Sequence, residues 1–314
     1  MKTSKFLIGS ATLSLAALLA ISGCKKKDKN EETPDTETSY VQDHNLAETH
    51  NNDIGNIGGE AGETYTVSNY RLENGLLVGG IQSAPCATVT VDLAAKHFTV
   101  DFGTTPCLCK DGRYRSGKLL YDYSASTNGA IYPRQPGYSI TCTSQNYVVD
   151  GYTVNIVNRT HANTTPFGFN PSTTNLQWQI NANINIVKPS NGGTITWNCT
   201  RTVELTNTSD TTVYHPSGNF PIAWNKAQLK LNGSANGTTA SGVGYTVSLS
   251  NLLWSATCTP DPLRPFRHPF IAGSVTFTPA NKPARVINYG NGSCDFNAQV
   301  CIPAYNYCTN ITLP

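Results

Sequence analysis

Cysteine is the residue type best able to do covalent chemistry in this chain of 314 residues, which contains ten cysteines and one methionine. So many cysteines are typical of an oxidising compartment, where thiols pair as disulfides. Cys24 stands apart because it ends an apolar N-terminal segment. Nine cysteines remain, so at least one thiol is unpaired. The nine are Cys86, Cys107, Cys109, Cys142, Cys199, Cys258, Cys294, Cys301 and Cys308.

Three pairs of these cysteines flank short hairpins or turns that a disulfide would close. The predicted pairs are Cys86 with Cys107, Cys258 with Cys294, and Cys301 with Cys308. Spacing leaves other connectivities open, and it assigns no partner to Cys109, Cys142 or Cys199. Cys107 and Cys109 would supply half of a metal site, but no Cys or His pair at zinc-site spacing accompanies them. We therefore expect disulfides and no metal.

Residues 112–118 contain the glycines and the lysine of a phosphate-binding loop. Leu119 stands where a Ser or Thr would bind Mg²⁺, and residues 118–124 alternate as a strand where the motif requires a helix. We therefore expect no nucleotide cofactor. The formal net charge of +2 also gives no electrostatic case for a nucleic-acid partner.

Acidic and basic side chains form no recognisable catalytic constellation. Most of the ten carboxylates after Thr64 lie on the polar side of expected strands or in turns, where a solvated carboxylate is the ordinary finding. The four histidines of this region are scattered, and no Gly-x-Ser-x-Gly motif occurs. We assign no catalytic residue, and an envelope hydrolase directed at glycans stays as an alternative.

Two loop residues are candidates for contact with glycans. Trp224 lies in the turn-rich stretch 216–225, where an exposed indole would stack on a sugar, although packing in the core is the interpretation we favour. Thr211, between Asp210 and Thr212, resembles a short O-glycan acceptor pattern of exported proteins. It lies in a polar loop that an enzyme could reach.

The first 24 residues are typical of an export signal. Lys2 and Lys5 supply the positive start, and residues 6–20 supply an apolar stretch too short for a transmembrane helix. Gly23-Cys24 after small residues resembles the lipobox of bacterial lipoproteins. We therefore predict a signal peptide over residues 1–23 and a lipid anchor on Cys24 that attaches the chain to a membrane. A chance cysteine beside an ordinary cleavage site is the alternative.

The rest of the chain divides by composition into three parts. Residues 24–39 carry four lysines and five acids, with no apolar residue after Cys24, which predicts a disordered tether. Residues 40–63 have sparse apolar positions beside several Asn and Gly residues, which predicts a short helix or linker. Residues 64–314 alternate apolar and polar side chains and form the third part.

The alternation over residues 64–314 has the period of two that half-buried strands require. Gly, Asn and Pro clusters separate about fourteen strands, and no segment between them is long enough for a crossover helix. We therefore predict an all-β domain: a large antiparallel meander that forms a curled sheet, part-barrel or sandwich. One face is rich in Thr, Ser and Asn, which disfavours a membrane barrel with its apolar outer band.

Several short motifs together suggest that this chain is related to a known group of proteins. They are the lipobox, the lysine and acid tether, Asp101-Phe102-Gly103-Thr104, Asp111-Gly112-Arg113, Ser116-Gly117-Lys118, residues 273–278, and Tyr289-Gly290 before Cys294-Asp295. With these motifs the chain resembles a family of uncharacterised lipoproteins common in Bacteroidetes-type bacteria. The resemblance implies an outer-membrane lipoprotein facing the periplasm or the cell surface, and it carries over no catalytic residue.

These observations favour a lipid-anchored binding, adhesion or structural module whose partner is a glycan or an envelope protein. The alternatives are the glycan-directed hydrolase and a carrier of an apolar ligand. Facing carboxylates in a cleft would favour the hydrolase, aromatic side chains on the surface would favour glycan binding, and an apolar trough would favour the carrier.

Replacing Cys24 with alanine tests the lipid anchor. Because the thiol carries the lipid, Cys24→Ala is expected to leave the protein unprocessed or released from the membrane. Detergent partitioning and palmitate labelling measure this, and a variant that partitions and labels like the natural chain would contradict the prediction.

Overall fold

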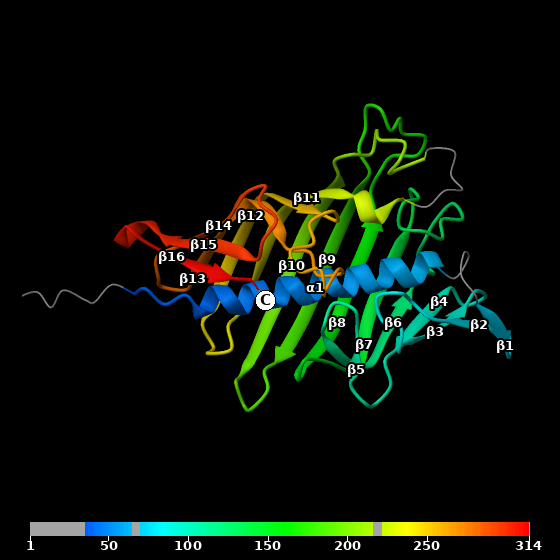
Figure 1. Cartoon of the computed structure of the whole chain (residues 1–314), viewed down its shortest axis with the longest axis horizontal. Helices are drawn as coiled ribbons and strands as arrows, with labels where there is room; N and C mark the ends of the chain where they lie inside the picture. The colour runs from blue at the N-terminus through cyan, green and yellow to red at the C-terminus, as the bar shows by residue number, and fades with distance from the viewer. Residues whose placement is uncertain (1–34, 65–69, 216–221, 314) are drawn as a thin grey trace, which may run out of the picture. The chain divides into compact units, whose positions relative to one another are not determined.

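The computed structural model describes residues 35–64, 70–215 and 222–313 (Figure 1). Within these ranges the chain forms the α-helix α1 (Ser39–Thr64), two short 3-10 helices, η1 (Trp224–Lys226) and η2 (Pro303–Tyr305), and sixteen strands. The strands are β1 (Arg71–Glu73), β2 (Leu76–Gly79), β3 (Thr88–Asp92), β4 (His97–Asp101), β5 (Cys107–Leu108), β6 (Tyr114–Asp122), β7 (Ser139–Val149), β8 (Tyr152–Asn163), β9 (Gln177–Val187), β10 (Thr194–Leu205), β11 (Gln228–Thr238), β12 (Gly244–Ser255), β13 (Phe270–Pro279), β14 (Arg285–Asn291), β15 (Asn297–Ile302) and β16 (Tyr307–Thr312).

The strands form one antiparallel sheet in chain order, which confirms the predicted meander. Its edges are β1 and β16, it is not closed into a barrel, and β5 pairs with β6 beside the main path. The sheet has more strands than the alternation predicts, because β1 and β5 are too short to show a period. The expected signal peptide, Cys24 and most of the tether lie outside the described residues.

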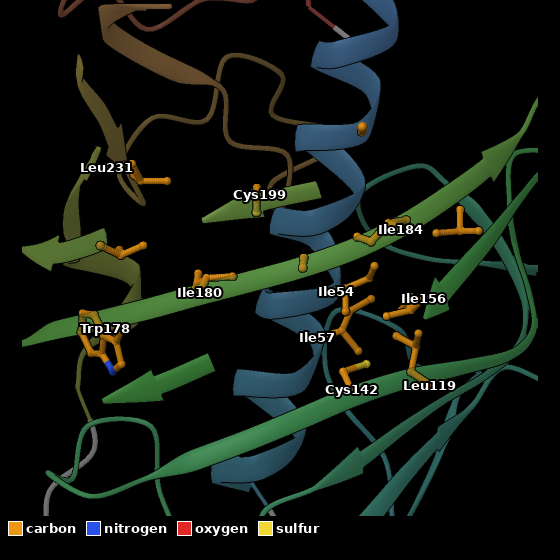
Figure 2. Close-up of a cluster of buried hydrophobic side chains, with 14 of the residues drawn as sticks. Ile54, Ile57, Leu119, Cys142, Ile156, Trp178, Ile180, Ile184, Cys199 and Leu231 are labelled. Atoms are coloured by element: carbon orange, nitrogen blue, oxygen red, sulfur yellow. The ribbon is translucent and has the colours of Figure 1, made fainter. Parts of the chain in front are cut away.

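The period of two places one set of side chains in the core and the other in solvent. In β9, for example, every second side chain from Trp178 to Ile184 is buried, including Ile180 and Ala182, while the polar residues Gln179, Asn181 and Asn183 that alternate with them are exposed. Figure 2 shows these buried side chains on the same side of the sheet as Ile54 and Ile57 of α1. The core therefore lies between the sheet and the helix.

Helix α1 is 26 residues long and crosses several strands on this inner face (Figure 1), where the sequence predicts only a short helix or linker. Its glycines, which weaken an isolated helix, let the sheet approach closely. A Cβ atom on Gly55 would lie 2.5 Å from Nη2 of Arg159, and one on Gly58 would lie 2.4 Å from the ring of Tyr121. No helix in the described ranges is long and apolar enough to cross a membrane.

The buried side of α1 is also polar, and arginines of the sheet bind it. Arg201 of β10 donates hydrogen bonds to both carboxylate oxygens of Glu48, with an Nη2–Oε2 distance of 2.5 Å. Arg159 of β8 donates from Nε to Oδ1 of Asn51 at 2.9 Å. Charge-assisted hydrogen bonds of this kind satisfy polar groups that burial would otherwise penalise.

The same pattern continues along the helix and the segment before it. Arg115 of β6 pairs with Asp53 at 2.7 Å, and Arg134 pairs with Glu63 at 2.7 Å. We call these contacts, together with those of Glu48 and Asn51, the arginine row. Near the start of the helix further ion pairs join the helical segment to the sheet: Asp43 with Lys188, and Asp35 with Lys282 and Arg285.

Removing the charge of Glu48 is expected to destabilise the fold strongly. Arg201 has no exposed surface and Glu48 is 3 % exposed, so Glu48→Gln leaves a buried cation without a counter-ion. Losing one partner of a buried pair costs about 3 to 5 kcal/mol. Urea unfolding measures this change in the free energy of unfolding.

Glu73→Gln is the control, because Glu73 pairs with Arg71 on the surface. Exposed pairs contribute less than about 1 kcal/mol. Equal unfolding midpoints for Glu48→Gln and Glu73→Gln would contradict a structural role for the arginine row.

Candidate functional site

The structure joins six cysteines into three disulfides, which are the three pairs predicted from spacing. The Cα–Cα distances are 6.0 Å for Cys86 and Cys107, 5.3 Å for Cys258 and Cys294, and 4.1 Å for Cys301 and Cys308. Each lies close to the range that a disulfide allows. Each bond joins cysteines that are close in the sequence, so the pairs could be predicted from their spacing alone.

The remaining three cysteines of the described chain are buried thiols. Cys142 and Cys199 lie on the inner face near α1 (Figure 2), where burial raises the pKa of each thiol to about 12. They are therefore inert at neutral pH. Cys109 is different, because its Sγ lies within 4.8 Å of the Sγ atoms of both Cys86 and Cys107.

Two carboxylates of the described core share an arginine. Asp53 and Asp111 both accept hydrogen bonds from Arg115, at 2.7 Å and 2.5 Å from Nη2. Burial raises the pKa of Asp111, but Arg115 outweighs that effect and holds it below the usual value. Both carboxylates are thus occupied by the guanidinium of Arg115. This arrangement stabilises the fold and leaves neither group placed to transfer a proton to a substrate.

A pocket lies where three loops meet at one end of the strands. In an antiparallel meander every second connection falls at the same end, so the loops after β6, β8 and β10 are neighbours (Figure 1). The pocket has a volume of about 260 Å³. We call it the loop pocket, and its lining residues are Arg134, Gln135, Pro136, Phe167, Gly168, Phe169, Pro171, Tyr214 and His215.

Aromatic rings supply the apolar part of the loop pocket. Phe169 and Tyr214 pack with their ring centroids 5.7 Å apart. Phe167 is 61 % exposed, and the tip of its ring lies over Gly137, where an added Cβ would be 2.9 Å from it. Gly137 has φ of +88°, which favours glycine. The pocket therefore presents one accessible ring on a defined backbone.

Polar contacts hold the loop that carries Arg134 and Gln135. Gln135 Oε1 accepts hydrogen bonds from the backbone N–H groups of Ile131 and Tyr132, and Trp178 Nε1 donates to the Pro133 carbonyl at 2.7 Å. Glu63 neutralises Arg134, which also lies 4.3 Å from the centroid of the Tyr132 ring. The pocket is thus rigid on this side and close to neutral.

The two loop residues singled out in the sequence lie near this end of the sheet. Trp224 is half-buried and packs against Trp178, with the ring centroids 6.2 Å apart. Its indole therefore packs against the core and is not an open stacking surface. Thr211 is exposed in a turn in which Asp210 accepts a hydrogen bond from the backbone of Thr212. Modification of Thr211 stays a prediction.

Sequence reasoning missed the loop pocket because its parts are far apart in the chain. Phe167 and Phe169 stand between Pro166 and Pro171, and Arg134 and Gln135 stand between two prolines of their own. The signal in the sequence that could have indicated this pocket is the presence of aromatic or polar residues inside loops bounded by prolines. Residues 112–118, by contrast, form a turn and the start of β6, which is the strand connection that the sequence indicates.

The outer face of the sheet is almost free of formal charge from β7 to β13, whereas β4 and β6 carry Asp101, Lys118 and Asp122 there. From β7 to β13 its outward positions are mostly Thr, Ser, Asn and Gln, and its charged residues are Glu204 and Lys230, which pair with each other at 2.7 Å. Neighbouring strands are joined by side-chain hydrogen bonds as well, such as Thr200 Oγ1 to Asn181 Oδ1 at 3.0 Å. This gives a neutral, hydrogen-bonding surface.

Comparison with family models, curated proteins and solved structures found no match to this chain. The resemblance to surface lipoproteins therefore stays a prediction, and the function has to be argued from the site.

Buried histidines make the fold sensitive to acid. Burial lowers the pKa of His44 to about 4, and His44 Nδ1 accepts a hydrogen bond from Trp197 Nε1 at 3.3 Å. Burial also lowers the pKa of His50 and His161 to about 3. An unfolded histidine takes up its proton near pH 6.5. As the pH falls below 6.5, the unfolded state therefore binds protons first and the folded state loses stability.

We expect this loss to be measurable between pH 7 and pH 5, the range over which an unfolded histidine takes up its proton. His44→Phe should reduce the difference in unfolding free energy between the two pH values by about 2 kcal/mol. His97→Asn, on the exposed face, is the matched control. An unchanged pH dependence in His44→Phe would contradict the prediction.

Proposed function

We propose that this chain is an exported, lipid-anchored binding module of the cell envelope that holds a neutral glycan in the loop pocket. The observation that carries the proposal is the convergence of Phe167, Phe169 and Tyr214 with Gln135 and the neutralised Arg134. The lipobox and tether support the anchor, and they favour an outer-membrane location that faces the periplasm or the cell surface.

The chemistry of the pocket suits a sugar. A pyranose ring has an apolar face that packs on an aromatic ring, and hydroxyl groups that exchange hydrogen bonds with amides. Phe167 offers the accessible ring, and the side chain of Gln135 lies in the same lining. A few polar groups in an aromatic pocket are the usual means by which proteins orient small ligands. The volume of about 260 Å³ is suited to a single sugar unit.

Charge supports a neutral ligand over an acidic one. Glu63 already neutralises Arg134, and on the outer face Glu204 and Lys230 neutralise each other. An acidic polymer would find no row of unpaired cations on these parts of the surface. The hydroxyl and amide side chains from β7 to β13 would instead hydrogen-bond a neutral polymer that extends from the pocket.

The alternatives have less support. A hydrolase of the common type needs two carboxylic acids at the bond to be cleaved, and the lining of the loop pocket contains neither Asp nor Glu. A carrier needs an apolar cavity for its cargo, whereas α1 and the arginine row occupy the inner face of the described sheet. The remaining alternative is that the partner is an envelope protein and not a glycan, and the binding test below can distinguish the two.

Replacing the accessible ring tests the proposal. Phe167→Ala is expected to weaken binding about tenfold, which corresponds to about 1.4 kcal/mol, because a stacked aromatic contributes energy of this size. Because the ring is largely exposed, the fold should be unaffected. Binding is measured on an array of neutral oligosaccharides, with acidic oligosaccharides for comparison, and then by calorimetry with the best ligand.

Phe266→Ala is the matched control, because Phe266 is a partly exposed phenylalanine that contributes nothing to the pocket lining. It should bind like the natural chain. Equal affinity in both variants, or binding to acidic oligosaccharides alone, would contradict a neutral-glycan site at Phe167.

A further inference from the structure

The geometry points to a thiol–disulfide exchange site formed by Cys86, Cys107 and Cys109, in which the Cys109 thiol displaces Cys107 from its bond with Cys86. This site is independent of the loop pocket. It would let one surface cysteine, Cys86, hold either of two buried partners. We call these three residues the cysteine cluster.

Proximity is the first support. The three Sγ atoms lie within 4.8 Å of one another. Cys109 is 4 % exposed and Cys107 is 7 % exposed, whereas Cys86 lies on the surface. A thiol fixed this close to a disulfide reacts without having to diffuse to it, which gives an intramolecular exchange a large advantage over exchange with another molecule.

The exchange requires no oxidant or reductant. The Cys109 thiol first loses its proton to solvent, and the thiolate attacks Sγ of Cys86. A Cys86–Cys109 bond forms, the Cys86–Cys107 bond breaks, and Cys107 leaves as a thiolate that takes up a proton. One disulfide and one thiol are present before and after, so atoms and electrons balance.

Attack on Cys86 is favoured over attack on Cys107. Residues two apart in an extended segment have Cα atoms about 6.6 Å apart, which is close to the upper limit for a disulfide, so a Cys107–Cys109 bond fits poorly. A Cys86–Cys109 bond would close a loop only two residues longer than the present one. The entropy of loop closure changes slowly with loop length. The two disulfide pairings therefore have nearly the same entropic cost.

Charged neighbours set the rate of exchange. Burial raises the pKa of Cys109, Arg115 opposes that effect, and Asp111 and Asp53 add to it. Tyr147 also interacts electrostatically with Cys109 and Arg115, and burial raises the pKa of its hydroxyl group. The reactive thiolate is therefore scarce at neutral pH and becomes more abundant as the pH rises. Asp53 belongs to α1, so the position of the helix influences the reactivity of Cys109.

The test follows which thiol is free. Purified exported protein is held at pH 8.5, samples are quenched with acid at intervals, and free thiols are labelled with N-ethylmaleimide after acid denaturation. Peptide mapping without reductant is expected to show the label moving from Cys109 to Cys107 as a Cys86–Cys109 peptide appears. Cys109→Ser should abolish both changes, and Cys142→Ser, which removes another buried thiol, should leave them intact.

A second variant tests the alternative pairing directly. In Cys107→Ser, air oxidation is expected to give a Cys86–Cys109 disulfide in place of two free thiols. Circular dichroism establishes that each variant is folded, and if Cys107→Ser does not fold, the comparison of the natural chain with Cys109→Ser decides. Free Cys86 and Cys109 in folded, oxidised Cys107→Ser, or no movement of label in the natural chain, would overturn the exchange site.

Discussion

Ion pairing between the buried side of α1 and the arginines of the sheet is the interaction on which the rest of this structure depends. A single open sheet has two faces, and one of them must be covered for the chain to have a core. In the described part of the chain helix α1 supplies this cover, and its contacts include Glu48 with Arg201 and Asp53 with Arg115. Such pairs fix the helix at one position on the sheet, because a shifted helix would leave buried charges without partners.

That constraint also connects the regions where chemistry is available. Glu63, close to the end of α1, neutralises Arg134 in the loop pocket. Asp53, farther back in the helix, contacts Arg115 beside Cys109. The outer face from β7 to β13, by contrast, takes little part in the core and carries mostly uncharged hydrogen-bonding side chains. Charged side chains thus fix the helix on the inner face, and the outer face from β7 to β13 is left nearly neutral.

The sequence predicts the sheet better than the helix or the pocket, for physical reasons. Alternation in segments such as β9 is a local property of the chain, and so are the hairpins that the disulfides close. In α1, however, Glu48 and Asn51 look like solvent-facing residues until the arginines that bury them are known. Gly58 looks like a helix breaker until the ring of Tyr121 is placed against it. The loop pocket and the position of Cys109 likewise depend on contacts between distant segments.

Amide hydrogen exchange of the intact chain, resolved by peptide, is the measurement that most directly tests the central role of the helix. If the arginine row makes α1 and the sheet one cooperative unit, the amides of α1 will exchange as slowly as those of β8, β9 and β10, at the rate of global unfolding. Exchange of α1 that is orders of magnitude faster than that of these strands would mean that the helix detaches by itself, and it would contradict the account.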